Sequence, residues 1–187
     1  ELMTGLTLDY KLKGANRHAG RIMLEVENLS RAGQYQDVSF RLHQGEVLGL
    51  CGLLGAGRTE LALSLFGMTR PDSGKIYLDS KPVRFRSHED AIKAGIGYVS
   101  EDRLTLGLVL QQSVADNTVL AILDQLRGRF HLIDEYRKNK LILQWIEKLG
   151  VKVSDPDQAI ATLSGGNQQK IVLAKWVLTQ PKILILD

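Results

Sequence analysis

The chain has little of several features that would assign it to a specialised class of protein. Its single cysteine, Cys51, excludes an internal disulfide framework and fits a reducing compartment. No apolar run approaches the roughly 20 residues of a membrane-spanning helix, so a membrane role is expected to depend on a partner. The net charge is only +3 with both signs interspersed, which gives no reason to expect a nucleic-acid partner.

The chain does have enough apolar residues for a folded domain. An apolar share of 44% over 187 residues is sufficient to bury the core of one domain, or of a domain with a subdomain. Ser87 and Gly95 are expected to begin and end a helix over 88–94. Strands are predicted where apolar residues alternate with polar ones or form short runs between turn residues. These segments are 22–26, 38–42, 46–51, 75–79, 83–85, 96–99 and 183–187.

Residues 52–59 read Gly-Leu-Leu-Gly-Ala-Gly-Arg-Thr and have the spacing of a phosphate-binding loop. This glycine loop follows the predicted strand 46–51, in which Cys51 is expected to be a small buried residue, and precedes a helical pattern over 59–66. Its glycines let main-chain N–H groups turn toward an anion, and the following helix adds partial positive charge. A basic side chain then reaches the phosphates and the Thr59 hydroxyl can ligate Mg²⁺. Arg58 departs from the pattern, which expects lysine.

Two later segments also carry groups suited to phosphate chemistry. Residues 163–170, Leu-Ser-Gly-Gly-Asn-Gln-Gln-Lys, open a helix that continues over 171–178, with Ser164 as N-cap and two glycines that expose main-chain N–H groups. This is a second candidate anion site, although a Ser-Gly entry is also ordinary at a helix without a ligand. The strand 183–187 is of the buried type and ends in Asp187, which suits an acid that orients Mg²⁺ through water.

The middle of the chain combines a polar strand end with a helical region. The strand 96–99 ends at the polar cluster 100–103, the position at which open parallel sheets place their ligands. From 104 to about 149 the pattern is helical, and Asp134 is expected to cap a helix that Gly150 ends. The apolar stripe of this helix is predicted to comprise Tyr136, Leu141, Ile142, Trp145 and Leu149. The sequence therefore predicts a helical subdomain inserted into an α/β core.

The glycine loop, the 163–170 stretch and the 183–187 strand resemble, in order and spacing, the Walker A, signature and Walker B segments of ABC transporter ATPases. Residues 55–61, 100–103 and 163–170 are similar to the second nucleotide-binding half of tandem ATPase subunits of bacterial sugar importers, of the ribose, galactose, arabinose and autoinducer-2 type. The resemblance implies a linker from an upstream half over 1–20 and a partial nucleotide-binding domain over 21–187. The implied fold is an α/β P-loop NTPase core of the ABC type with an antiparallel β subdomain and an inserted helical subdomain. The helical subdomain would cover about 104–178, including the signature helix, and the domain would be truncated after the Walker B strand.

The resemblance implies ATP and Mg²⁺ as ligands and assigns roles to individual residues. Glu101 stands where the family has the glutamine that reaches the metal and the attacking water, and Asp187 would be the Walker B acid. Both would be catalytic and, with Thr59, would bind the metal. The signature would contact nucleotide held by the partner half, because ABC halves close head to tail. The implied nucleotide contacts are Gly52, Leu53, Leu54, Gly55, Ala56, Gly57, Arg58, Thr59, Glu60, Ser164, Gly165, Gly166 and Gln168.

The chain departs from the family pattern at positions that matter for hydrolysis. Arg58 carries a planar guanidinium group on a long side chain, where lysine would carry a compact charge. Glu101 would place a carboxylate, which only accepts hydrogen bonds, near a polyphosphate. No aromatic residue stands where the family often stacks one on adenine, with Tyr35 as a substitute, and Asn167 replaces the common glutamine of the signature. The chain stops at Asp187, before the family's water-activating glutamate and its histidine. We expect a degenerate glycine-loop site, an intact signature that completes the ATP site of the other half, and no meaningful hydrolysis by this stretch alone.

The resemblance also implies partners and a location. The partners are the first nucleotide-binding half or another ATPase subunit, a transmembrane permease and, indirectly, a periplasmic binding protein, at the cytoplasmic face of the bacterial inner membrane. Nucleic acid is not expected. Three alternatives remain open. The first alternative, a P-loop GTPase or kinase, does not account for the signature stretch, and the guanine-binding motif N-K-x-D is absent from the sequence. A non-transport ABC ATPase, of the DNA-repair or translation kind, does not share the Arg-Thr-Glu-Leu continuation, and a regulatory module would bind nucleotide without turnover.

Overall fold

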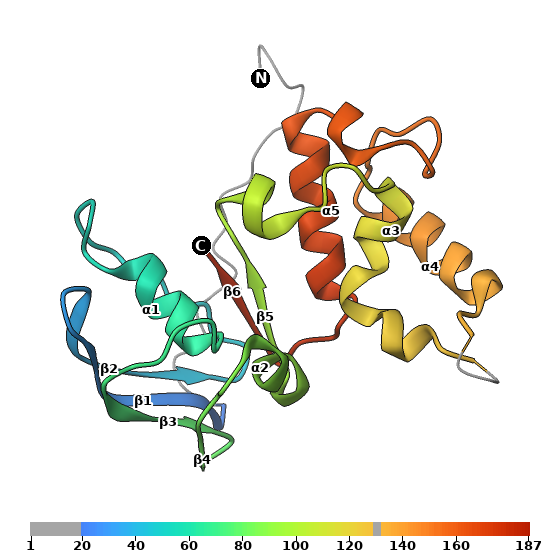
Figure 1. The fold of residues 1–187 in the computed structure, drawn as a ribbon. Helices are drawn as coiled ribbons and strands as arrows, with labels where there is room; N and C mark the ends of the chain where they lie inside the picture. The colour runs from blue at the N-terminus through green and yellow to red at the C-terminus, as the bar shows by residue number, and fades with distance from the viewer. Residues whose placement is uncertain (1–19, 129–131) are drawn as a thin grey trace.

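The computed structural model describes residues 20–128 and 132–187, which form two lobes joined by a parallel strand pair (Figure 1). An antiparallel sheet builds one lobe, helices build the other, and the strands β5 and β6 lie between them. The predicted linker over 1–20 falls, apart from Gly20, outside the described residues. Within the described ranges, no helix has the length and apolar character needed to cross a membrane.

Four antiparallel strands form the first lobe, in the order β2-β1-β3-β4. In chain order the strands are β1 Ile22–Arg31, β2 Tyr35–His43, β3 Ser73–Leu78 and β4 Lys81–Val83. Val26 in the central strand β1 pairs with Ile76 of β3 and is 1% exposed. It belongs to a buried cluster with Leu61 and Leu65 of helix α1 (Arg58–Leu65), so α1 covers one face of the sheet. The expected antiparallel subdomain is confirmed.

A parallel pair of strands connects the lobes. β5 (Ile96–Val99) and β6 (Ile183–Leu186) run side by side along their whole lengths. Helix α2 (His88–Ala94) precedes β5 and ends, as predicted, at Gly95, whose φ of 93° only glycine adopts readily. All four residues of β5 are buried, whereas Leu186 is 68% exposed. The expectation of a fully buried last strand is therefore wrong, because among the described strands β6 has a neighbour on one side only.

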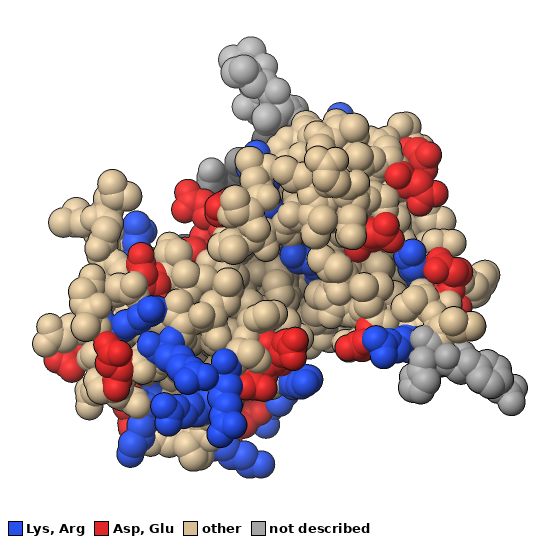
Figure 2. Space-filling model, viewed as in Figure 1, with Lys and Arg blue, Asp and Glu red and all other residues tan. Residues whose placement is uncertain are grey.

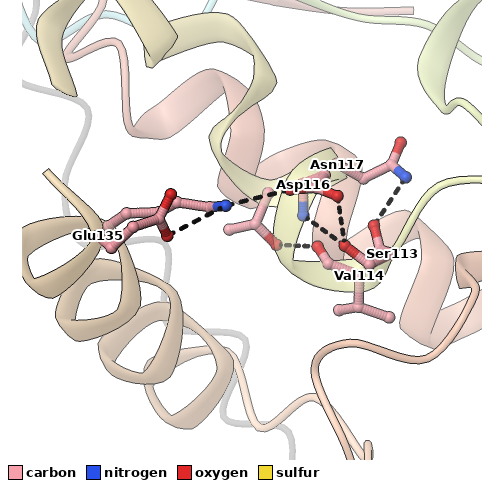
Figure 3. A network of polar contacts seen from close by, with 7 residues as sticks. Ser113, Val114, Asp116, Asn117 and Glu135 are labelled. Carbon is pink, nitrogen blue, oxygen red and sulfur yellow. Dashed lines mark hydrogen bonds and ion pairs between the residues drawn. The ribbon is translucent and has the colours of Figure 1, made fainter. Parts of the chain in front are cut away.

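The second lobe consists of three helices and shorter turns. The helices are α3 Val114–Val119, α4 Glu135–Lys148 and α5 Gly165–Val177, with a π-helical turn η1 Arg103–Gly107 and 3₁₀ turns η2 Leu120–Leu126 and η4 Ile160–Thr162. Ser113 caps α3, since its Oγ accepts the N–H of Asp116 at 2.9 Å (Figure 3). The Asp116 carboxylate in turn forms an ion pair with Nζ of Lys138 in α4 at 3.3 Å. This network ties α3 to α4 at their N-terminal ends.

One of the three buried apolar clusters in the described part of the chain joins α1, β5 and α5. Ile171 and Val172 of this helix have no exposed surface. The ring of Phe66, after α1, stacks on Tyr98 of β5 at 5.2 Å between centroids and meets Trp176 edge-on at 5.3 Å. The predicted signature helix is therefore anchored by its buried residues in this cluster.

The segment 46–51 does not form the predicted strand. Val47 is 97% exposed, and Cys51, expected to be buried, is exposed. A strand needs neighbours that take up its main-chain groups. In the described parts of the chain, 46–51 pairs with none of the six strands, although β6 has a neighbour on one side only.

The apolar stripe predicted for α4 includes one residue too many. Asp134 caps the helix as expected, by accepting the N–H of Arg137 at 3.0 Å, and Ile142 is 2% exposed. Tyr136, however, is 81% exposed. An α-helix turns about 100° per residue, so Tyr136 lies about 180° round the axis from Trp145 and faces away from the packed side.

Candidate functional site

The glycine loop leads into the N-terminus of α1; the N–H of Ala56 donates to the main-chain oxygen of Leu53 at 3.0 Å, and the next three N–H groups are available. Gly55 and Gly57 have φ angles of 79° and 78°, in the left-handed region that favours glycine. Gly57 is the N-cap of α1. No described residue accepts a hydrogen bond from the main-chain N–H of Gly57, Arg58 or Thr59. A helix start with such donors and a partial positive charge can hold a phosphate group.

The turn between β1 and β2 packs directly against the glycine loop. A Cβ added to Gly57 would lie 2.1 Å from the main-chain oxygen of Gln34, so only glycine fits there. Tyr35 follows; it is 8% exposed and donates its hydroxyl to Oγ of Ser64 at 2.7 Å. Burial raises the pKa of this hydroxyl. The suggestion that Tyr35 stacks on adenine is wrong, because its side chain belongs to the buried cluster under α1.

Asp187 brings three separate parts of the chain together. Its Oδ1 accepts the hydroxyl of Thr59 at 3.0 Å, and its Oδ2 accepts the hydroxyl of Tyr98 at 2.7 Å. Its main-chain N–H donates to Val99 at 3.0 Å and continues the pairing of β6 with β5. The pKa of Tyr98 is raised, mainly by burial and then by its hydrogen bond to Asp187, with smaller contributions from the charges of Asp187 and Glu101. The carboxylate thus stands at the glycine loop, at the end of the parallel strands.

Thr59 and Asp187 supply oxygen ligands of the kind that Mg²⁺ prefers. No group of three or more His, Cys, Asp or Glu side chains suited to a metal ion occurs within residues 20–128 and 132–187. This donor set nevertheless fits Mg²⁺, which usually binds through one or two carboxylates, with substrate phosphates and waters as its other ligands. The arrangement therefore suits a complex of metal and phosphate better than a metal ion alone.

Glu101 is exposed at the carboxyl end of β5, on a turn whose other residues are fixed. Oγ of the buried Ser100 accepts the N–H of Asp102 at 3.1 Å. Asp102 in turn accepts the hydroxyl and the N–H of Thr105, and these bonds lower the pKa of its carboxyl group. The Glu101 side chain forms no hydrogen bond or ion pair with another described residue. Its carboxylate is available to a ligand on the same side as Asp187.

The entry to α5 is a second helix start with unused donors. Ser164 is its N-cap residue, as predicted, but its side chain makes no capping bond. Its Oγ instead accepts Nδ2 of Asn167 at 3.1 Å. The Asn167 Oδ1 accepts the N–H of Lys152 at 3.1 Å. In the described part of the chain, nothing accepts a hydrogen bond from the main-chain N–H of Gly165 or Gly166.

Arg103 is a residue at this entry that the sequence analysis missed. Its Nε donates to Oε1 of Gln168 at 3.2 Å, and a Cβ on Gly165 would lie 2.9 Å from its Nη2. Gln168, assigned above to nucleotide contact, is 6% exposed and also donates to the main-chain oxygen of Ile160 at 3.2 Å. The polar cluster 100–103 marked Arg103 as lying at a strand end. Its partner lies 65 residues further along the chain, where no local pattern could indicate it.

The predicted contact residues fall into two groups rather than one. The glycine loop, Glu101 and Asp187 surround the carboxyl ends of β5 and β6, whereas the 163–170 stretch belongs to the other lobe. Helices α1 and α5 lie on opposite sides of the β5–β6 pair (Figure 1). Of the remaining predicted contacts, Gly52, Leu53, Leu54 and Ala56 are exposed and Glu60 is half-buried. A single copy of the chain does not bring both helix starts to one ligand.

Comparison with known proteins gives consistent matches. The family described as ABC transporter matches residues 35–187. The ribose import ATP-binding protein RbsA of Lacticaseibacillus paracasei is 42% identical over 185 residues, which cover 99% of this chain and 37% of that protein. RbsA of Caldanaerobacter subterraneus is 44% identical over 168 residues, 90% of this chain and 34% of that protein. The chain thus spans little more than a third of these relatives. A nucleotide-free ATP-binding cassette from an ABC transporter superposes with a TM-score of 0.72 at 20% identity, covering 89% of this chain and 69% of that one.

Proposed function

The chain belongs to the ABC transporter family, and we propose that it is a nucleotide-binding half of an ATPase that drives import of a sugar or a similar small polar solute. The observation that carries the proposal is the hydrogen bond of 3.0 Å between Thr59 and Asp187. It joins the end of the glycine loop to the acid after β6, as a site for a metal–phosphate complex requires. The substrate class rests on the relatives, which are ribose import ATP-binding proteins.

In this proposal the glycine loop would hold the phosphates of ATP, and Thr59 and Asp187 would hold its Mg²⁺. The N–H groups at the start of α1 hold phosphate oxygens, and Arg58 adds a positive charge. Thr59 and Asp187 hold the metal, which neutralises charge on the phosphates when bound. Glu101, exposed just after the carboxyl end of β5, would orient water or the metal. Leu53, Leu54, Ala56 and Glu60 contribute through the main chain of the loop and the first helical turn.

The proposed role of this half is asymmetric. Ser164, Gly165 and Gly166 begin α5, on the opposite side of the β5–β6 pair from α1, so they would complete the ATP site of the other nucleotide-binding half. Arg58 makes the site on this chain the weaker one for hydrolysis, because a long planar fork displaces phosphate from the geometry that a compact lysine sets. Its stem lies over the loop, since a Cβ on Gly52 would be 3.8 Å from its Cδ.

The proposed partners follow from the family. They are the first nucleotide-binding half of the same subunit or another ATPase subunit, a transmembrane permease and, through it, a periplasmic binding protein. The location would be the cytoplasmic face of the bacterial inner membrane. Arg58 also favours a second candidate, a regulatory half that binds nucleotide without turnover. Co-purification with a permease rather than with nucleic acid would separate a transporter half from a non-transport ABC ATPase.

Calorimetric titration of the intact protein with ATP, with and without Mg²⁺, tests the nucleotide site. We expect binding that Mg²⁺ strengthens and that Arg58→Ala weakens by about tenfold, since a charge-assisted contact to phosphate is lost. Arg127→Ala, which removes an exposed arginine of the other lobe, is the matched control and should leave the affinity unchanged. GTP should bind about as well as ATP, because no aromatic residue selects the base. Failure of a folded protein to bind ATP, or binding that ignores Arg58, would contradict the assignment.

A further inference from the structure

Three arginines line a hollow that belongs to no part of the site described above. Arg70, Arg84 and Arg86 surround a space of about 380 Å³. They come from different segments: Arg70 follows α1, Arg84 follows β4, and Arg86 precedes α2. Figure 2 shows Lys and Arg side chains gathered over this lobe, whereas the helical lobe carries few on the same face.

The backbone beneath these arginines is fixed by close packing. Gly67, with a φ of 78°, lies so close to the segment before α2 that an added Cβ would be 2.6 Å from the main-chain oxygen of Ser87. The same Cβ would be 2.8 Å from the Cβ of Phe85, whose side chain packs on the core. Phe85 is half-buried, whereas Arg84 and Arg86 on either side of it are exposed. The three arginines are held together by the fold and do not meet by chance rotamers alone.

None of the three guanidinium groups has an acidic partner among the described residues. Two other exposed arginines do form ion pairs, Arg41 with Glu25 at 2.6 Å and Arg127 with Asp124 at 2.9 Å. The carboxylate of Asp90 lies near Arg86, but its Oδ2 accepts the main-chain N–H of that residue at 2.9 Å. Three like charges around one hollow repel one another, and a bound anion would relieve that repulsion.

We propose that Arg70, Arg84 and Arg86 form a binding site for a phosphate group that carries more than one negative charge. A guanidinium group is a planar fork that matches phosphate oxygens with two parallel hydrogen bonds, and it remains charged at any physiological pH. The hollow suits a compact group, which is either a free phosphate compound or the headgroup of an anionic lipid. An extended polyanion would need a basic stripe rather than a three-sided hollow.

The test is calorimetric titration of the intact protein with inorganic pyrophosphate, together with sedimentation with vesicles of phosphatidylcholine with and without phosphatidic acid. The variant replaces Arg70, Arg84 and Arg86 by glutamine. The control replaces Lys140, Lys148 and Lys152, three exposed lysines of the other lobe, and so removes the same charge. Both are also made in the Arg58→Ala background, so that phosphate on the glycine loop is distinguished from phosphate in the hollow.

We expect the arginine variant to lose about 100-fold in affinity and the lysine control less than about twofold, in either background. A second variant replaces the three arginines by lysine and keeps the charge. A loss of affinity in this variant would show that the geometry of the guanidinium groups matters, and the variant replaces the glutamine variant if the latter fails to fold. Binding of pyrophosphate would identify the ligand as a free phosphate compound. Binding only to vesicles with phosphatidic acid would identify it as a lipid headgroup. Equal losses in variant and control, or no binding of either probe, would overturn the site. These outcomes do not depend on whether ATP binds the glycine loop.

Discussion

The two helix starts proposed to bind phosphate are held in place by different contacts. The start of α5 belongs to a helix whose Ile171 and Val172 are fully buried, and Arg103 and Gln168 fasten it to the turn after β5. The glycine loop follows an exposed segment, 46–51, that pairs with no described strand. It is held instead by local contacts at Gly57 and by the bond from Thr59 to Asp187.

This difference indicates how the two helix starts would work. A site on a packed helix is preorganised, so it presents its donors without a cost of ordering. A loop held by few contacts opens more readily and becomes ordered when its ligand binds. We infer that the signature side acts as a rigid surface for the nucleotide of the partner half, whereas the glycine loop gains order from its own nucleotide. Substitutions on the two sides should therefore differ in kind.

The sharpest contrast is between Gly57→Ala and Gly166→Ala. At Gly57 the new Cβ meets Gln34 in a backbone conformation that alanine avoids, and we expect a loss of about 2–4 kcal/mol in the free energy of unfolding. At Gly166 nothing lies within 4 Å of an added Cβ, so alanine should change stability by less than about 1 kcal/mol, in the stabilising direction. Chemical denaturation measures both. Equal losses would remove the structural distinction between the two sites.

Asp187→Asn should act on the glycine-loop side alone. The amide keeps the size of the carboxylate but loses the charge that a divalent cation requires, so the strengthening of ATP binding by Mg²⁺ should fall by about tenfold. Asp157→Asn, at an exposed aspartate of the other lobe, is the control. Calorimetry with and without Mg²⁺ gives the result. An unchanged effect of Mg²⁺ would remove Asp187 from the metal site.

Lys175, inside the helical lobe, makes the stability of that lobe depend on pH. Its Nζ donates to the main-chain oxygen of Gly107 at 2.5 Å, and burial lowers the pKa of the amine from 10.5 to about 8. Between these values the unfolded chain holds more protons than the native one, so the free energy of unfolding rises with pH. Lys175→Met should remove this rise, about 1 kcal/mol per pH unit at most, whereas Lys140→Met should retain it. Chemical denaturation at pH 8 and 10 measures this rise in the free energy of unfolding. The same rise in Lys175→Met as in the unmodified protein would contradict the role given to Lys175.

Arg103→Ala should have the smallest effect, and it should be local to the start of α5. Loss of the bond to Gln168 removes one hydrogen bond, so amide exchange at 165–168 should become about threefold to tenfold faster, with little change at the glycine loop. Hydrogen exchange followed by mass spectrometry measures this. Arg127→Ala is again the control. Faster exchange at both sites would indicate general loosening rather than a role of Arg103 in holding α5.

The local parts of the fold could be predicted from the sequence, and the pairings over long distances could not. Gly95 and Asp134 end and begin their helices as predicted, because a positive φ and a cap depend on neighbouring residues. The segment 46–51 has the composition of a strand, but a strand also needs a partner, and composition does not specify one. Likewise Arg103 finds Gln168 across 65 residues only because η1 and α5 pack together. The resemblance supplied the candidate contacts, and the fold showed that they lie in two groups.

We propose that this chain contributes its signature, more than its own glycine loop, to ATP hydrolysis. The ATPase rate of the intact protein with Ser164→Arg and with Arg58→Ala, measured side by side, tests this claim. Ser164→Arg places a long side chain where the partner's phosphate would approach, and we expect the rate to fall more than about 100-fold, against less than about tenfold for Arg58→Ala. Ser154→Arg, at an exposed serine outside the signature, should leave the rate unchanged. Equal losses from Ser164→Arg and Arg58→Ala would contradict the claim.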